Sequence, residues 1–215
     1  MGDKYLRQLV IDELDFEPSV NAANIGAAVE KGVVTLTGHV SSYAEKVAAE
    51  HAVQRVKGVR GVAMELEVRY PNDKKTADDQ IAQRALSIIT WDAQVPTGSV
   101  QVTVQQGWVT LTGAVEWYYQ KNAAETAVRK LSGVIGVSNK IEVTPRVLVS
   151  DVKNKIMAAL QRSADLEANA VRVAVEGGKV KIEGKVKAWY ERDLIERAAW
   201  SAPGVREVED NLKLA

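Results

Sequence analysis

The two histidines are the residues of this chain best suited to metal binding or proton transfer. Neither His39 nor His51 belongs to a His-Glu-x-x-His or comparable cluster, and the nearby carboxylates are scattered. The sequence holds no Gly-x-Ser-x-Gly, phosphate-binding loop or dinucleotide-binding glycine motif, and it has no cysteine. The residue types therefore predict a protein that is not an enzyme, with no catalytic residue, metal site or cofactor. An enzyme would need a convergent polar pocket, which the pattern does not indicate.

Aromatic residues at three equivalent places in the chain, each followed by a basic residue, are the first candidate binding sites. Rings with a polar end favour wet interfaces such as membrane head groups and protein partners, and a neighbouring cation suits lipid phosphate. The alternative is that the rings pack over the start of a helix. The residues are Tyr43 with Lys46; Trp117, Tyr118 and Tyr119 with Lys121; and Trp189 and Tyr190 with Arg192.

A run of alternating lysines is the second candidate. Side chains two positions apart share one face of a strand, so these lysines predict a basic stripe for anionic lipid or an acidic partner. The alternative is a solvated sheet face that hinders edge aggregation. The stripe consists of Lys179, Lys181, Lys185 and Lys187 around Glu183, with Arg172 on the preceding strand.

Composition limits the other classes of function. The 215 residues are 46% hydrophobic and 26% charged, as in folded proteins, and 28 Lys and Arg balance 28 Asp and Glu. Zero net charge argues against nucleic-acid binding, and no apolar run predicts a membrane span. The N-terminal segment lacks a secretory pattern, which predicts a cytoplasmic location, or a periplasmic one if the natural N-terminus has been truncated.

An internal repeat determines which elements position these residues. Segments 32–40, 107–115 and 178–186 align with offsets of 75 and 71 residues, and a later Gly-Val pair keeps the same offsets. The two anchors are the central glycines Gly38, Gly113 and Gly184, and the later glycines Gly58, Gly133 and Gly204.

Each copy has the periodicity of a helix, two strands, a helix and a strand. In the second copy we expect helices over 78–89 and 116–131, strands over 100–104 and 108–115, and a last strand with Val137, Ile141 and Val143 inward. We expect Trp91 to cover the core. The prediction is an α+β fold of three αββαβ modules, each with two helices on a three-stranded mixed sheet. The predicted domains are 1–71, 77–146 and 147–215, joined by the proline-containing segments 70–76 and 144–146.

The repeat resembles the BON domain, a family named for bacterial OsmY and nodulation proteins. The central glycines, the apolar strands that precede them and the later Gly-Val pairs carry the resemblance over nearly the whole chain, which makes it OsmY-like. The resemblance implies an αββαβ fold and a non-enzymatic bacterial module linked to osmotic or envelope stress and proposed to bind phospholipid. The sequence shows no signal-peptide pattern and no lipid-anchor cysteine, so we expect it to depart in this respect from many family members.

Two tryptophans differ from their equivalents in the other copies. Trp108 lies on the predicted open sheet face, and Trp200 replaces polar residues of the last helix, so we assign both to inter-module contact or self-association. The preferred function is a non-catalytic binding or scaffold protein. The alternative is a self-associating structural or protein-partner-binding repeat protein in the cytoplasm, forming a homo-oligomer or filament.

Overall fold

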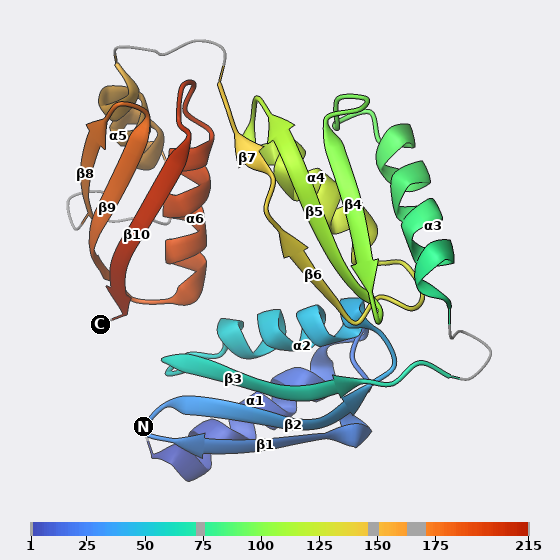
Figure 1. Cartoon of the computed structure of the whole chain (residues 1–215). Coiled ribbons are helices and arrows are strands. Elements are labelled where there is room, and N and C mark those ends of the chain that lie inside the picture. Colours follow the sequence, from blue (N-terminus) through green and yellow to red (C-terminus); the bar gives the residue numbers. More distant parts are fainter. Residues whose placement is uncertain (1, 72–75, 146–150, 163–170, 215) are drawn as a thin grey trace. The chain divides into compact units, whose positions relative to one another are not determined.

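The computed structural model describes residues 2–71, 76–145, 151–162 and 171–214. Within them, six α-helices and three sheets follow the order helix, strand, strand, helix, strand three times (Figure 1). This confirms the predicted α+β class and the three αββαβ modules. Parts of the predicted linkers, 72–75 and 146, lie outside the described residues.

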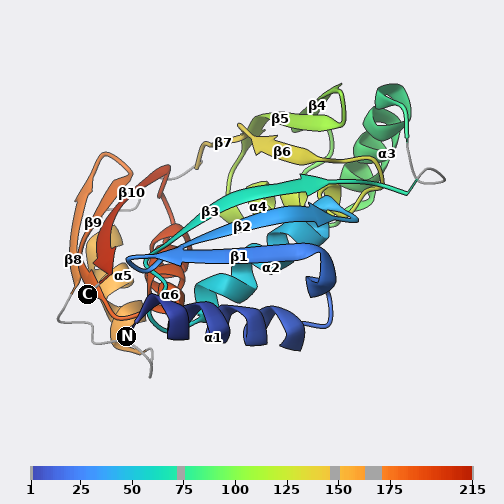
Figure 2. The ribbon, with the colours of Figure 1, turned by 90° about the horizontal axis from the view of Figure 1, so that it is seen from below.

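The first module is a mixed sheet with both helices on one face (Figure 2). Strand β2 is central: it pairs antiparallel with β1 and parallel with β3. The parallel pairing requires a crossover connection, which helix α2 supplies. The elements are α1 (Asp3–Phe16), the short helix η1 (Ala22–Asn24), β1 (Ile25–Glu30), β2 (Val33–Val40), α2 (Tyr43–Arg55) and β3 (Gly61–Val68).

The core of this module follows from two periodicities. Leu6, Val10 and Leu14 recur every four residues on α1 and are buried, while Val34 and Leu36 alternate with exposed or half-buried residues on β2. The predicted inward positions of β3 pack against this cluster. They are Val62, Met64, Leu66 and Val68.

The second module repeats this plan with a divided last strand. Its sheet has the order β4-β5-β6, and β7 also pairs with β5, so it has four strands where we expected three. Between β6 and β7, the Asn139 side-chain oxygen accepts the Ile141 backbone N–H at 3.3 Å. The elements are α3 (Asp78–Trp91), β4 (Val100–Gln105), β5 (Trp108–Val115), α4 (Tyr118–Val128), β6 (Gly136–Asn139) and β7 (Glu142–Val143).

Trp91 does not cover the core, so that expectation was wrong. Its side chain is 86% exposed at the last residue of α3. Ile81, Ala85 and Ile89 form the buried stripe of this helix. A position two residues beyond Ile89 lies about 200° around the helix, on the opposite face.

The third module has the sheet order β10-β9-β8, with β9 antiparallel to β8 and parallel to β10. Its core joins Ile156 and Leu160 of α5, Val180 and Ile182 of β9, and Ile195 of α6. The elements are α5 (Val152–Gln161), β8 (Val171–Glu176), β9 (Lys179–Val186), α6 (Trp189–Trp200) and β10 (Glu207–Leu214).

A tight turn fixes the start of each central strand. In the second module Gln106 and Gly107 both have positive φ, 51° and 79°, which is the backbone of a two-residue hairpin turn. The Asp78 carboxylate accepts the N–H groups of both residues, at 2.6 and 2.8 Å. The turn is thus held to the first turn of α3, and Trp108 follows it directly.

Candidate functional site

Near the start of the second helix of each module, an acidic or amide side chain accepts hydrogen bonds from backbone N–H groups. Glu45 is 6% exposed, and its carboxylate accepts the backbone N–H groups of Asn21 and Ser41 at 2.8 Å each. Gln120 accepts two N–H groups in the same way, and Glu191 accepts the Lys187 N–H at 2.7 Å. These side chains accept N–H groups of the residues that lead into the second helix, and Glu45 also binds the Asn21 N–H of the loop before η1. An acid or amide stands seven residues after each central glycine, which is a signal for this feature that we did not use in predicting the site.

The aromatic clusters divide into half-buried and exposed rings. The shared position, Tyr43, Tyr118 and Trp189, is half-buried, whereas Tyr119 and Tyr190 at the next position are 54% and 52% exposed. Successive helical residues point about 100° apart, so the two positions cannot face the same surroundings. The exposed tyrosines are therefore the solvent-facing part of the predicted contact site; Trp117 is half-buried.

The basic residues that follow the rings point toward their own modules. Lys46 Nζ donates to the Leu66 carbonyl of β3 at 2.8 Å, and Arg192 Nε lies 2.6 Å from Asp210 Oδ2 of β10. Burial lowers the pKa of Lys121, against the attraction of Glu125. Arg192 also lies 5.4 Å from the centre of the Trp189 ring. Lys46 and Arg192 therefore join the second helix to the last strand.

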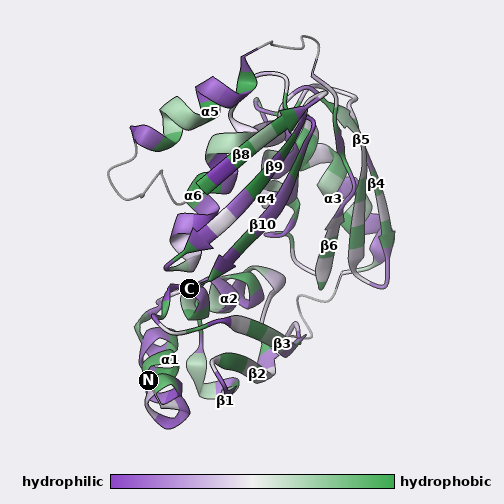
Figure 3. Cartoon of the chain, turned by 90° about the vertical axis from the view of Figure 1, so that its left-hand side faces the viewer, coloured by the Kyte–Doolittle hydropathy of each residue, from purple (hydrophilic) through white to green (hydrophobic). Residues whose placement is uncertain are grey.

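The predicted lysine stripe lies on the open face of the third sheet, where hydrophilic and hydrophobic residues alternate along the strands (Figure 3). Strand β10 brings carboxylates beside it. Lys179 Nζ lies 2.9 Å from Glu207 and 3.1 Å from Glu209, and Lys181 Nζ lies 2.7 Å from Glu183. Hydrogen bonds to these carboxylates raise the pKa of both lysines. This end of the stripe is internally neutralised.

The other end of the stripe is basic. Lys185 is the register partner of Lys213 on the parallel neighbour β10, and both side chains are exposed. Lys187 follows on the same face of the chain after β9 and is also exposed. The open face therefore has opposite ends of different charge, which the spacing of the lysines alone did not reveal.

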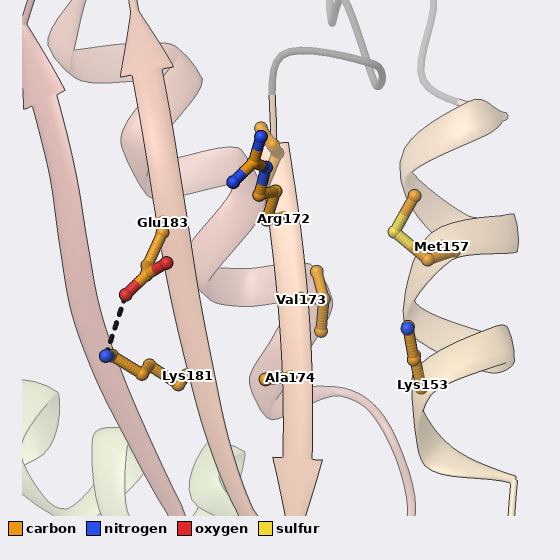
Figure 4. A pocket seen from close by; sticks show the side chains of 8 residues that line it. Lys153, Met157, Arg172, Val173, Ala174, Lys181 and Glu183 are labelled. Carbon is orange, nitrogen blue, oxygen red and sulfur yellow. Dashed lines mark ion pairs between the residues drawn. The ribbon is translucent and has the colours of Figure 1, made fainter.

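A hollow lies beside the edge strand β8 of this module (Figure 4). It has a volume of about 440 Å³ and combines cationic and apolar side chains from α5 and the sheet. Arg172 faces Glu183 in register, and Glu183 forms the ion pair with Lys181. Lys153 and Met157 of α5 line the opposite side. The hollow adds Lys153, which the sequence analysis did not single out, to the basic side chains of this module.

The sequence model of the BON domain matches this chain three times, over residues 2–70, 77–145 and 149–215. The chain belongs to the BON domain family. A curated relative, the osmotically-inducible protein Y of Escherichia coli K12, is 28% identical over 149 residues, covering 66% of this chain and 73% of that protein. The BON resemblance and its OsmY-like character, expected from the glycines, are thereby confirmed.

Two solved structures of a type III secretion system structural protein, CdsD of Chlamydia trachomatis, also align with this BON chain. One has 17% identity and a TM-score of 0.26 over 98% of this chain and 92% of that chain. The other, its C-terminal domain, has 14% identity and a TM-score of 0.27 over the full length of both. Scores this low support no argument about the arrangement of the BON modules.

The central glycines of the first two BON modules stand where a backbone carbonyl leaves no space for a side chain. In the first module Gly38 has φ 110°, and a Cβ there would lie 2.1 Å from the Asn24 oxygen. In the second, Gly113 has φ 125°, and its Cβ would lie 2.1 Å from the Ser99 oxygen. The later glycines Gly58, Gly133 and Gly204 all have φ between 90° and 99°. These positions shape the backbone and present no side chain to a ligand.

The two tryptophans assigned to contacts lie in different surroundings. Trp108 is 50% exposed on the open face of the second BON module. Trp200 packs partly against the core of the third module, and its indole N–H donates to Glu196 at 3.3 Å. Over the described ranges, no group of three His, Asp or Glu residues could hold a metal ion, and none of the helices is long and apolar enough to cross a membrane.

Proposed function

We propose that this BON protein is a non-catalytic binding protein that contacts anionic phospholipid surfaces through its third module. The observation that carries the proposal is the pairing of Lys185 with Lys213 across adjacent strands. Like charges directly opposite each other in a sheet are destabilising. An anionic lipid surface offers phosphates that offset this repulsion.

The ion pairs along the open face favour the Lys185 end of the stripe, and not the Lys179 end, as the part that contacts the lipid. Lys179 and Lys181 already have carboxylate partners, so moving them to a phosphate gains little. Among the residues that the structure describes, neither Lys185 nor Lys213 has a carboxylate within 4 Å of its ammonium nitrogen. A lysine near an anionic membrane surface contributes about 1 kcal/mol. The contact is therefore weak and local, in keeping with zero net charge over the chain.

A role in osmotic stress is part of the same proposal. It is supported by the relative whose name describes osmotic induction and by the three BON matches. Three modules on one chain would gain avidity if more than one of them met the same surface. We propose that the exposed Tyr119 and Tyr190, at the starts of the second helices, add to these contacts.

Vesicle flotation of the full chain tests the lipid contact. We expect flotation with vesicles containing phosphatidylglycerol, weakened by salt, and none with phosphatidylcholine alone. Lys185→Gln with Lys213→Gln should weaken binding by roughly tenfold or more, from about 1 kcal/mol per lysine. Lys179→Gln with Lys181→Gln is the matched control, since it removes two charges from the same face, and it should change binding by less than about twofold.

Three results would contradict this assignment. Equal loss in both double variants would mean that the whole stripe acts, as the sequence predicted. Loss in Trp117→Ala or Tyr119→Ala, with both lysine variants unaffected, would place the contact at the helix entrances. No flotation under any condition would rule out the lipid proposal for this chain.

A further inference from the structure

The open face of the second module carries an exposed indole in a hollow lined by uncharged side chains. Trp108 is the first residue of β5 and is 50% exposed, and Ile135 beside it is 38% exposed. Together they line a shallow hollow of about 330 Å³. This is within the range of about 300 to 1,000 Å³ that is usual for small-molecule sites.

The indole is supported from beneath by a glycine. A Cβ at Gly136 would lie 2.4 to 2.8 Å from three atoms of the six-membered ring of Trp108. The ring therefore packs directly on the backbone of β6, which only a residue without a side chain permits. The equivalent pair is Val33 with Gly61 in the first module and Lys179 with Glu207 in the third. The ring platform is thus specific to the second module.

The remaining side chains of the hollow are neutral hydrogen-bonding groups. Two hydroxyls and two amides surround the ring, and each of these groups can both donate and accept. Among the residues that the structure describes, none of those lining the hollow is charged. Its lining residues are Thr103, Gln105, Gln106, Trp108, Thr110 and Ile135.

The turn that precedes Trp108 is held in place. Asp78 accepts the N–H groups of Gln106 and Gly107, so the two residues before the ring are fixed to α3. A ligand that stacks on the ring meets a platform that is already ordered, and less conformational entropy is lost on binding.

We propose that this face binds a neutral saccharide chain, with one sugar ring stacked on Trp108. The C–H face of a pyranose ring is apolar and flat, so it packs on an aromatic ring, while its rim of hydroxyls both donates and accepts hydrogen bonds. Amide and hydroxyl side chains around an exposed indole match both parts. The absence of charge in the lining disfavours lipid phosphate and acidic partners, which the third module suits instead.

Titration of the ¹⁵N-labelled full chain with neutral hexasaccharides tests this proposal. The probes are maltohexaose, cellohexaose and chitohexaose, which differ in linkage and substituent. We expect at least one to shift the indole N–H signal of Trp108 and the amides of β4 and β5, with a weak, millimolar affinity. Trp108→Ala should weaken that binding about tenfold or more, whereas Trp108→Phe should keep part of it.

Trp91→Ala is the matched control, because Trp91 is an exposed tryptophan of the same module that lies outside the hollow. It should leave saccharide binding unchanged. The amide spectrum of each variant reports whether the module remains folded. The proposal is overturned if no hexasaccharide shifts the β4 and β5 signals, or if binding survives Trp108→Ala in a folded protein. Vesicle binding is measured on a different module, so either proposal can fail without the other.

Discussion

In the first two repeats, a backbone carbonyl oxygen explains why the central residue is glycine. In the second module the Ser99 oxygen occupies the position that a Cβ of residue 113 would need, and the backbone there has φ 125°. A side chain at this position meets both a steric clash and an unfavourable backbone conformation. The glycine can be found in the sequence, but the reason for it is visible only in the structure, where Ser99 directly precedes β4.

Gly113→Ala should destabilise the second module by about 2 to 4 kcal/mol, because the strand must move away from Ser99. Gly98→Ala is the control: its φ is 76°, but a Cβ there would meet nothing within 4 Å, so about 1 kcal/mol is expected. Native-state hydrogen exchange at Val109 and Leu111 measures this module separately from its neighbours. Equal losses in the two variants would show that backbone strain alone decides the effect.

At the scale of elements, ion pairs and hydrogen bonds add to the core contacts between the two helices of the first module. Arg55 near the end of α2 reaches Glu13 and Glu17, from α1 and its end, at 2.9 and 2.8 Å. A hydrogen bond from Ser19, followed by one from Arg55, holds the pKa of Glu17 below its usual value. The ionised form of Glu17 is therefore favoured in the folded module.

This arrangement predicts a pH dependence of the first module. A carboxylate whose folded pKa is lowered contributes stability above its unfolded pKa, and that stability is lost as the pH falls through the folded pKa. Between about pH 5 and pH 3, the first module should lose more stability in the wild type than in Arg55→Gln. Urea unfolding, followed by the methyl signals of Leu14 and Val53, gives the comparison. Parallel pH curves for the two proteins would contradict the prediction.

At the scale of the whole molecule, the modules share a core plan and differ in their surfaces. The large exposed apolar side chains, such as Phe16, Trp91, Trp108 and Tyr190, are spread over all three modules. Scattered apolar residues are normal on a monomer, whereas an interface requires a contiguous patch. The balanced net charge gives no repulsion against assembly. The distribution of exposed apolar side chains, and not the net charge, therefore favours a binding protein over a self-associating one.

We expect the full chain to keep the mass of a single chain in light scattering as its concentration rises, without vesicles. A mass that rises with concentration would favour the self-associating alternative. If Trp108→Ala or Trp200→Ala restored the single-chain mass and Trp91→Ala did not, the contact would be assigned to that tryptophan. The saccharide proposal would then be tested at concentrations where the chain is dissociated.

The sequence by itself determined the repeat, the order of elements, most of the core and the BON family, because these depend on periodicity within short segments. It could not determine which charges meet, since Lys179 finds Glu207 and Glu209 only through the register of two strands joined by a helix. The placement of Trp108 on Gly136 and the inward turn of Lys46 toward β3 have the same origin. Side-chain partners distant in sequence are chosen by packing, so the tertiary structure decided which surfaces remain to bind.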